Sequence, residues 1–194
     1  MWIVKLLTLI ILISIIIFFI KFNKKDVVYV KSDLDERKYL VRDLKDKQMA
    51  ANMLAKIRKN IFILVDYLNE NKNRYPNYIQ SIEQLVKKIQ NVIILESDDG
   101  SNYTSYSINK GEQIVFCIRS KKNKNKIHDL NLIMYVVLHE LGHVGCKEHG
   151  HTELFKNIFA FFTMVAIDIG LYKKIDFEKD PTEYCGLTIT DSII

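Results

Sequence analysis

The sequence predicts an α+β protein, in which an N-terminal transmembrane helix precedes one domain of helices and a small antiparallel sheet. Three observations predict this fold class. An uncharged apolar run begins the chain, apolar residues recur at helical spacing in four later segments, and β-rich segments lie in the middle. The 194 residues are 48% hydrophobic and 26% charged, which suits one domain with a hydrophobic core plus an appendage.

The apolar run predicts the transmembrane helix. Residues 6–20 carry no charge, and with their flanks they give roughly 20 residues, or about 30 Å of helix, which matches the hydrocarbon core of a bilayer. Trp2 suits the interface and Lys5 can extend toward water. A cleaved signal peptide is the alternative, but no small-residue cleavage site follows the run. We therefore expect an uncleaved anchor over residues 1–25.

The flanking charges predict the orientation of this anchor. The lysines of "KFNKK" follow the run, whereas only Lys5 precedes it, so the positive-inside tendency places the larger C-terminal part in the cytoplasm. The three cysteines, Cys117, Cys146 and Cys185, are an odd and scattered set, unlike the disulfide framework of an exported domain. The sequence thus predicts a single-pass membrane protein with a cytoplasmic domain.

After a charged connector at residues 26–44, the chain predicts two helices. The first begins near Asp46 and ends before a polar loop that contains Pro76, and the second is shorter. Their apolar faces are formed by Met49, Met53, Ile57, Ile61, Leu64, Val65 and Leu68, and by Ile79, Ile82, Leu85, Val86 and Ile89. We interpret both as core-packing helices of a domain that spans residues 45–194.

The middle of the chain predicts strands. The segments "NVIILES", "YTSYSI" and "QIVFCIRS" have strand composition, and the tight turn "NKGE" joins the last two. The basic segment "KKNKNK", residues 121–126, is interpreted as a solvated loop, and the alternative is a patch that binds acidic protein or nucleic acid. A net charge of +5 is too modest to require nucleic acid.

Two apolar helices are predicted next. Asp129 suits the N-cap of "LNLIMYVVLHELGHV", which Gly145 can end. Another helix begins near Thr152 and contains "ELFKNIFAFFTMVAIDIG". Lys156 and Asp168 bracket only 11 residues of it, too few to cross a bilayer, so this helix is expected in the core. The tail beyond it shows no clear periodicity.

The motif "HELGH" contains candidate metal ligands and a candidate general base. His139 and His143 are four residues apart, so on a helix they project from one face and can bind one metal ion at about 2.0–2.1 Å each. Glu140 is displaced around the helix and can reach a water on that metal. Zinc lowers the pKa of such a water toward about 7, and the carboxylate takes its proton, which is the working arrangement of a zinc peptidase.

The surroundings of this motif favour a metal site over a chance match. Apolar residues cover nearly all sides of the helix, so the histidines and Glu140 are expected to be buried. Burying these groups without partners would cost several kcal/mol. A metal ion is the simplest partner, and a hydrogen-bonded polar cluster is the alternative.

A zinc site with an open position needs a third protein ligand. We favour His151, because it lies where a loop enters the next helix and Phe155, four residues later, can anchor that turn in the core. His149, Glu153 and Cys146 are the alternatives.

The combination of "HELGH", a short loop with glycine and "GHTELF" resembles the WLM and SprT-like zinc peptidases. In that superfamily a loop histidine follows the H-E-x-x-H helix, and an aromatic residue follows it at the spacing of His151 and Phe155. The segments "NKGEQIVFCIRS", "FAFF" and "EYCGLTI" are also similar to WLM-like proteins of large DNA viruses, some of which have an N-terminal anchor. The resemblance implies a zincin-like domain with an active-site helix, and the loop here is longer than in WLM proteins.

The resemblance also implies that a strand beside the active-site helix receives the substrate, and residues 115–118 are candidates. Tyr184 and Arg119 are candidates for stabilising the oxyanion. The sequence therefore predicts a membrane-anchored zinc metallopeptidase acting on protein or peptide substrates, with His139, His143 and His151 as zinc ligands and Glu140 as general base. The alternatives are a catalytically inactive scaffold stabilised by zinc and a nucleic-acid-associated module using residues 121–126.

Overall fold

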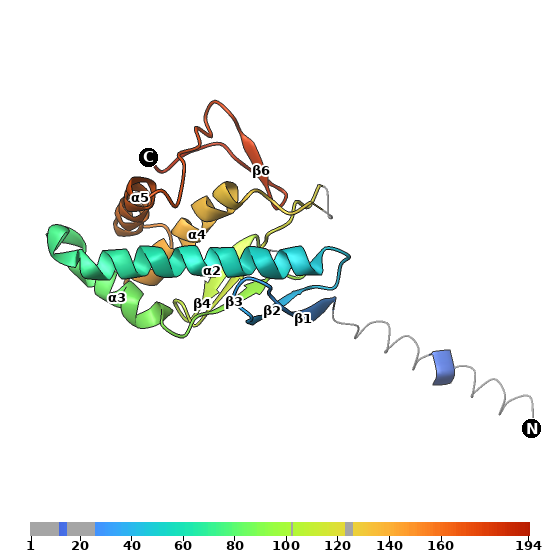
Figure 1. The fold of residues 1–194 in the computed structure, drawn as a ribbon. Helices are drawn as coiled ribbons and strands as arrows, with labels where there is room; N and C mark the ends of the chain where they lie inside the picture. The colour runs from blue at the N-terminus through green and yellow to red at the C-terminus, as the bar shows by residue number, and fades with distance from the viewer. Residues whose placement is uncertain (1–11, 15–25, 102, 123–125) are drawn as a thin grey trace, which may run out of the picture.

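The computed structural model describes residues 12–14, 26–101, 103–122 and 126–194 (Figure 1). It is an α+β structure, as predicted. In chain order the elements are β1 (Val27–Lys31), β2 (Lys38–Arg42), α2 (Lys47–Glu70), the short 3-10 turns η1 (Lys72–Arg74) and η2 (Pro76–Tyr78), α3 (Ile79–Ile89), β3 (Ile93–Glu96), β4 (Ser105–Ile108), β5 (Gln113–Phe116), α4 (Leu130–Gly145), α5 (Glu153–Asp168), β6 (Thr182–Tyr184) and β7 (Leu187–Ile189).

Three strands form the sheet next to the central helices, in the order β3-β5-β4. Strands β4 and β5 are an antiparallel hairpin, as predicted, whereas β3 runs parallel to β5. The sheet is therefore mixed rather than antiparallel. Strand β5 lies in the middle, where Ile114 pairs with Ile94 on one side and Ser107 on the other, and β4 forms an edge.

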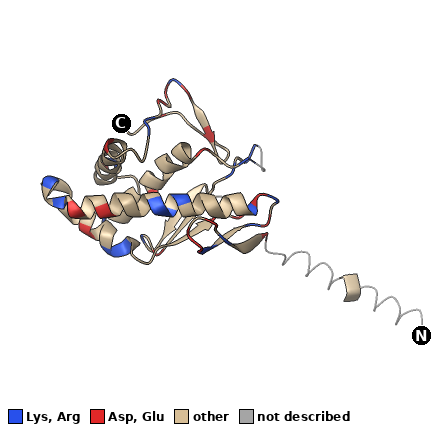
Figure 2. Ribbon diagram, in the orientation of Figure 1, with Lys and Arg blue, Asp and Glu red and all other residues tan. Residues whose placement is uncertain are grey.

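The first two predicted helices are confirmed as α2 and α3, and their predicted apolar faces form much of the core. Leu54, Ile61 and Leu68 of α2 and Ile82 and Leu85 of α3 are fully buried. Charged residues lie on the outer side of α2, on α3 and in the loops, whereas α4 and α5 carry few (Figure 2). This distribution is the one expected of amphipathic helices that cover a core.

Helix α4 occupies the centre of the fold, in contact with α2, α3, α5 and strand β4 (Figure 1). Ile133, Val137 and Leu141 are fully buried on it. The predicted N-caps at both apolar helices are confirmed, because the side chain of Asp129 accepts a hydrogen bond from the backbone N–H of Asn131, and Thr152 caps α5.

Two hairpins were not predicted. The segment expected as a charged connector contains the antiparallel pair β1–β2, and Val41 of β2 is fully buried against the core. The C-terminal tail contains the pair β6–β7, joined by the two-residue turn Cys185–Gly186, in which both residues have positive φ. Such short strands become stable only through partners elsewhere in the chain, so their sequences carry weak local signals.

The prediction of an N-terminal transmembrane helix, and of a single-pass membrane protein with a cytoplasmic domain, is corrected by the structure. Within the described ranges, no helix has both the length and the apolar composition that crossing a bilayer requires. The longest of these helices, α2, has 24 residues but is amphipathic, and the apolar α5 has 16 residues, or about 24 Å. Apart from residues 12–14, the segment 1–25, for which the helix was predicted, lies outside the described residues.

Candidate metal centre

Helix α4 and helix α5 pack closely where the motif residues lie. A Cβ atom at Gly142 would lie 3.1 Å from the ring of Phe155 and 3.2 Å from the Cβ of Phe159, so glycine at this position lets the two helices approach. His139 and His143 project from the same side of α4, one turn apart.

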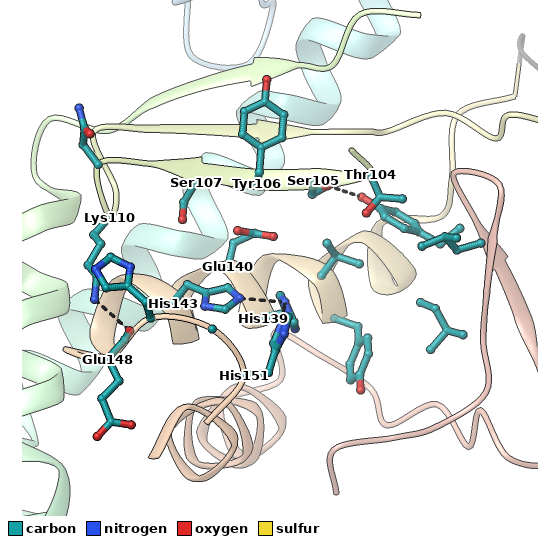
Figure 3. A pocket seen from close by; sticks show the side chains of 18 residues that line it. Thr104, Ser105, Tyr106, Ser107, Lys110, His139, Glu140, His143, Glu148 and His151 are labelled. Carbon is teal, nitrogen blue, oxygen red and sulfur yellow. Dashed lines mark hydrogen bonds between the residues drawn. The ribbon is translucent and has the colours of Figure 1, made fainter. Parts of the chain in front are cut away.

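Three imidazoles converge at this point. The Nε2 atom of His139 lies 3.2 Å from that of His143 and 3.1 Å from that of His151, and the ligand atoms of all three lie within 4.8 Å of one another. Figure 3 shows His139 and His143 on α4 and His151 on the following loop pointing toward one another. Two nitrogens bound tetrahedrally to one zinc at 2.0–2.1 Å would be about 3.3 Å apart. The three histidines therefore have the spacing of a metal site.

The chemistry of the donor set also fits a cation. A neutral imidazole has one N–H, so the Nε2 atom of His139 can share at most one proton with its two neighbours. The other close approach then lacks a well-directed hydrogen bond, which is unfavourable unless a cation lies between the ring nitrogens. The residues present thus fit a metal ion.

Phe155 supports all three histidines. Its ring stacks on His143 at a centroid distance of 4.1 Å and makes edge contacts with His139 at 5.0 Å and His151 at 4.9 Å. The side chain of Phe155 is buried and its backbone N–H donates to the Thr152 hydroxyl. The first turn of α5 thereby fixes the orientation of the imidazoles.

Burial lowers the pKa values of His139 and His143 and raises that of Glu140, so the neutral form of each is favoured. The pKa of His139 falls to about 3, chiefly by burial and then by the neighbouring histidines, and the pKa of His143 falls to about 4, chiefly by burial and then by His151 and Lys110. Neutral imidazole is the form that binds metal. Burial raises the pKa of Glu140 to about 7, and this residue is only 4% exposed.

The histidines and Glu140 open onto a cavity of about 670 Å³. Glu140 lies between the histidines and strand β4 (Figure 3). Another part of the wall comes from the C-terminal hairpin, which contributes Tyr184, Leu187 and Ile189. Helix α4, the edge strand β4 and the C-terminal hairpin thus surround one cavity.

The alternatives for the third ligand lie elsewhere. His149 is exposed at the cavity wall, outside the cluster of ligand atoms, and Cys146 is buried with a free thiol. Glu153 is exposed and pairs with Lys156 at 2.7 Å. Of the downstream candidates, His151 is the one that the structure brings to His139 and His143.

Of the two candidates for stabilising the oxyanion, the structure places Tyr184 at the cavity and Arg119 away from it. Arg119 is 3% exposed and forms ion pairs with Glu96, at 2.6 Å, and with Asp46, away from the cavity. Tyr184 lines the cavity, and its hydroxyl lies 2.9 Å from the Ser105 hydroxyl. Burial raises the pKa of Tyr184 well above its ordinary value, so the phenol keeps its proton.

The prediction that residues 115–118 receive the substrate as an added strand is wrong. Residues 115–118 begin on β5, which is paired on both sides, so its backbone groups are already used by β3 and β4. Of the two edge strands, β4 is the one at the cavity, and Thr104, Ser105 and Ser107 on and beside it line the cavity. Strand order depends on long-range pairing, which the local pattern of "QIVFCIRS" does not contain.

A disulfide bond joins Cys117, just after β5, to Cys185 in the turn of the C-terminal hairpin. The odd and scattered set of cysteines did not indicate this bond. The two are 68 residues apart in the chain, and only the fold brings them together. His128 supports the same turn, because its Nε2 atom accepts a hydrogen bond from the Cys185 N–H at 3.3 Å.

No family model matches the chain. It is 45% identical to the uncharacterized protein R325 of Acanthamoeba polyphaga mimivirus, over 99% of this chain and 97% of that protein. It is also 44% identical to protein 136R of invertebrate iridescent virus 6 over 35% of this chain and 38% of that protein. Its structure is similar to that of a Wss1 mutant from Saccharomyces cerevisiae, with a TM-score of 0.50 and 18% identity, covering 68% of this chain and 91% of the other.

The likeness to Wss1 concerns the fold, whereas the mimivirus protein is related along nearly its whole length. We conclude that the chain has a Wss1-like α+β fold and belongs to the same family as mimivirus protein R325.

Proposed function

We propose that the protein is a zinc metallopeptidase of the H-E-x-x-H type, which hydrolyses peptide bonds in protein or peptide substrates. In this proposal His139, His143 and His151 hold the zinc ion, and Glu140 is the general base. The observation that carries it is the convergence of three imidazoles beside a buried carboxyl group in a cavity bordered by an edge strand. The resemblance of "HELGH" and "GHTELF" to WLM and SprT-like peptidases supports the same assignment.

A bound zinc ion would supply Lewis-acid activation of water and of the peptide carbonyl. Glu140 takes the proton of the attacking water and returns it to the amine that leaves when the C–N bond breaks. A pKa near 7 suits both steps, because the same carboxyl group then accepts and releases a proton near neutral pH.

Strand β4 is the proposed binding surface for the substrate. As an edge strand it has backbone N–H and C=O groups free to pair with an extended peptide, which would place that peptide along the cavity that contains Glu140. The Tyr184 hydroxyl lies beside the start of β4, 2.9 Å from the Ser105 hydroxyl, and is proposed to donate a hydrogen bond to the carbonyl oxygen as negative charge develops on it.

Replacing Glu140 with Gln tests the proposal. The amide cannot take a proton from water, so turnover should fall about 10²–10⁴-fold while the zinc content stays unchanged. Hydrolysis of an unfolded protein and of a peptide mixture would be followed by mass spectrometry, with metal analysis of the same samples. Glu153→Gln, at an exposed carboxylate near the site, is the matched control and should keep both activity and zinc.

Unchanged turnover in Glu140→Gln would contradict the mechanism. A wild-type protein that binds zinc and melts when it is chelated, yet hydrolyses neither substrate, would instead support the zinc-stabilised scaffold.

A further inference from the structure

The loop that carries His151 is held mainly by side chains from other parts of the chain. Residues 147–151 are all exposed, so burial contributes little to their order. Helix α4 ends just before them, and the last carbonyl groups of a helix have no partners within it. The position of His151 therefore depends on what satisfies these carbonyl groups.

Lys110 provides most of these contacts. Its ammonium group donates to the backbone oxygens of Cys146 at 2.8 Å and Lys147 at 2.8 Å. It also donates to that of Glu148 at 3.0 Å (Figure 3). An ammonium group has three N–H donors, and here three carbonyl groups accept them. Gln84 of α3 also donates to the backbone oxygens of Val144 and Cys146.

The backbone at Lys110 offers an independent observation. Lys110 lies in the tight turn between β4 and β5, where the N–H of Gly111 donates to the carbonyl of Ile108, and both Asn109 and Lys110 have positive φ, 49° and 52°. Asn-Gly is the preferred pair for a turn of this kind, and lysine is uncommon there. A side chain retained in an unfavourable backbone conformation indicates a role for that side chain.

We infer that Lys110 is a positioning residue for the metal centre: it ties the loop that carries His151 to the turn that follows the substrate strand β4. This inference rests on the proposed function. The lysine touches neither metal nor substrate in this account. It acts through the loop backbone, and so sets how closely His151 approaches His139 and His143.

The direct readout is the zinc affinity of the full chain, measured by competition with a chromophoric chelator. Lys110→Met removes the three donors and should weaken zinc binding about 10- to 100-fold, the range for changing a residue that orients a metal ligand. Lys110→Gly gives the turn its preferred Asn-Gly sequence, so this second variant should keep the hairpin and show the same loss of affinity. Lys87→Met, at an exposed lysine of α3, is the charge-removal control and should bind zinc as the wild type does.

A double-mutant cycle separates positioning from a general effect of charge or folding. If Lys110 acts through His151, then adding Lys110→Met to a His151→Ala protein should change the remaining zinc affinity by less than about 2-fold. An equal loss in both backgrounds, or unchanged affinity in Lys110→Gly, would overturn the inference while leaving the proposed peptidase intact. A wild-type chain that does not bind zinc would contradict the proposed function itself, and the inference with it.

Discussion

His139 and Glu140 follow one another in the sequence, and burial favours the neutral form of both. For the histidine this means a lowered pKa, which leaves the nitrogen lone pair free for a metal. For the glutamate it means a raised pKa, which brings the carboxyl group close to the range useful for proton transfer. One physical cause thus shifts the pKa values of two adjacent residues in the directions that the proposed mechanism requires.

At the residue scale, the role of Tyr184 is testable. Tyr184→Phe removes the hydroxyl while keeping the ring, so kcat should fall about 10- to 10³-fold, with KM and zinc content little changed. Ser105 keeps its hydrogen bond from the Cys117 N–H, which limits structural side effects. Tyr103→Phe, at a residue that is 68% exposed, should match the wild type in steady-state kinetics. A kcat for Tyr184→Phe equal to the wild-type value would remove Tyr184 from the mechanism.

At the element scale, the helices and the β4–β5 hairpin could be predicted from the sequence, whereas the β1–β2 and β6–β7 hairpins could not. Helix signals are local: Asp129 and Thr152 are caps, and the apolar spacing in α2 and α3 repeats within a few turns. Strands β1, β2, β6 and β7 have three to five residues each and depend on partners elsewhere. The position of β5 in the middle of the sheet, which moves the proposed substrate strand to β4, depends in the same way on long-range pairing.

At the element scale, we expect the disulfide bond to stabilise the C-terminal hairpin. This hairpin carries Tyr184 and Leu187 of the cavity wall, and the bond from Cys185 to Cys117 ties it to the end of β5. Changing both cysteines to Ser should lower the free energy of unfolding by about 2–5 kcal/mol, measured by urea denaturation, and should reduce activity as the wall loosens.

Reducing agent should lower the stability of the wild-type protein in the same way and leave the double-Ser variant unaffected. A wild-type unfolding curve that is the same with and without reductant would show that the bond does not stabilise this hairpin.

At the scale of the whole molecule, the chain brings residues from four separate regions to one cavity. Helix α4 supplies His139, Glu140 and His143, the next loop supplies His151, β4 supplies a polar edge, and the tail supplies Tyr184. The motif and its loop histidine were visible in the sequence because their spacing is short. The contributions of Lys110, β4 and the disulfide were not, because each joins segments that are far apart in the chain. The transmembrane prediction rested on composition alone, and no described helix meets its requirement.

The metal content of the purified full chain tests the central claim most directly. Measured by mass spectrometry for the wild type, His151→Ala and His149→Ala, it should be about one zinc per chain in the wild type and in His149→Ala, and far less in His151→Ala. A wild-type chain that is free of metal and equally stable in EDTA, or zinc lost with His149→Ala but retained with His151→Ala, would contradict the account.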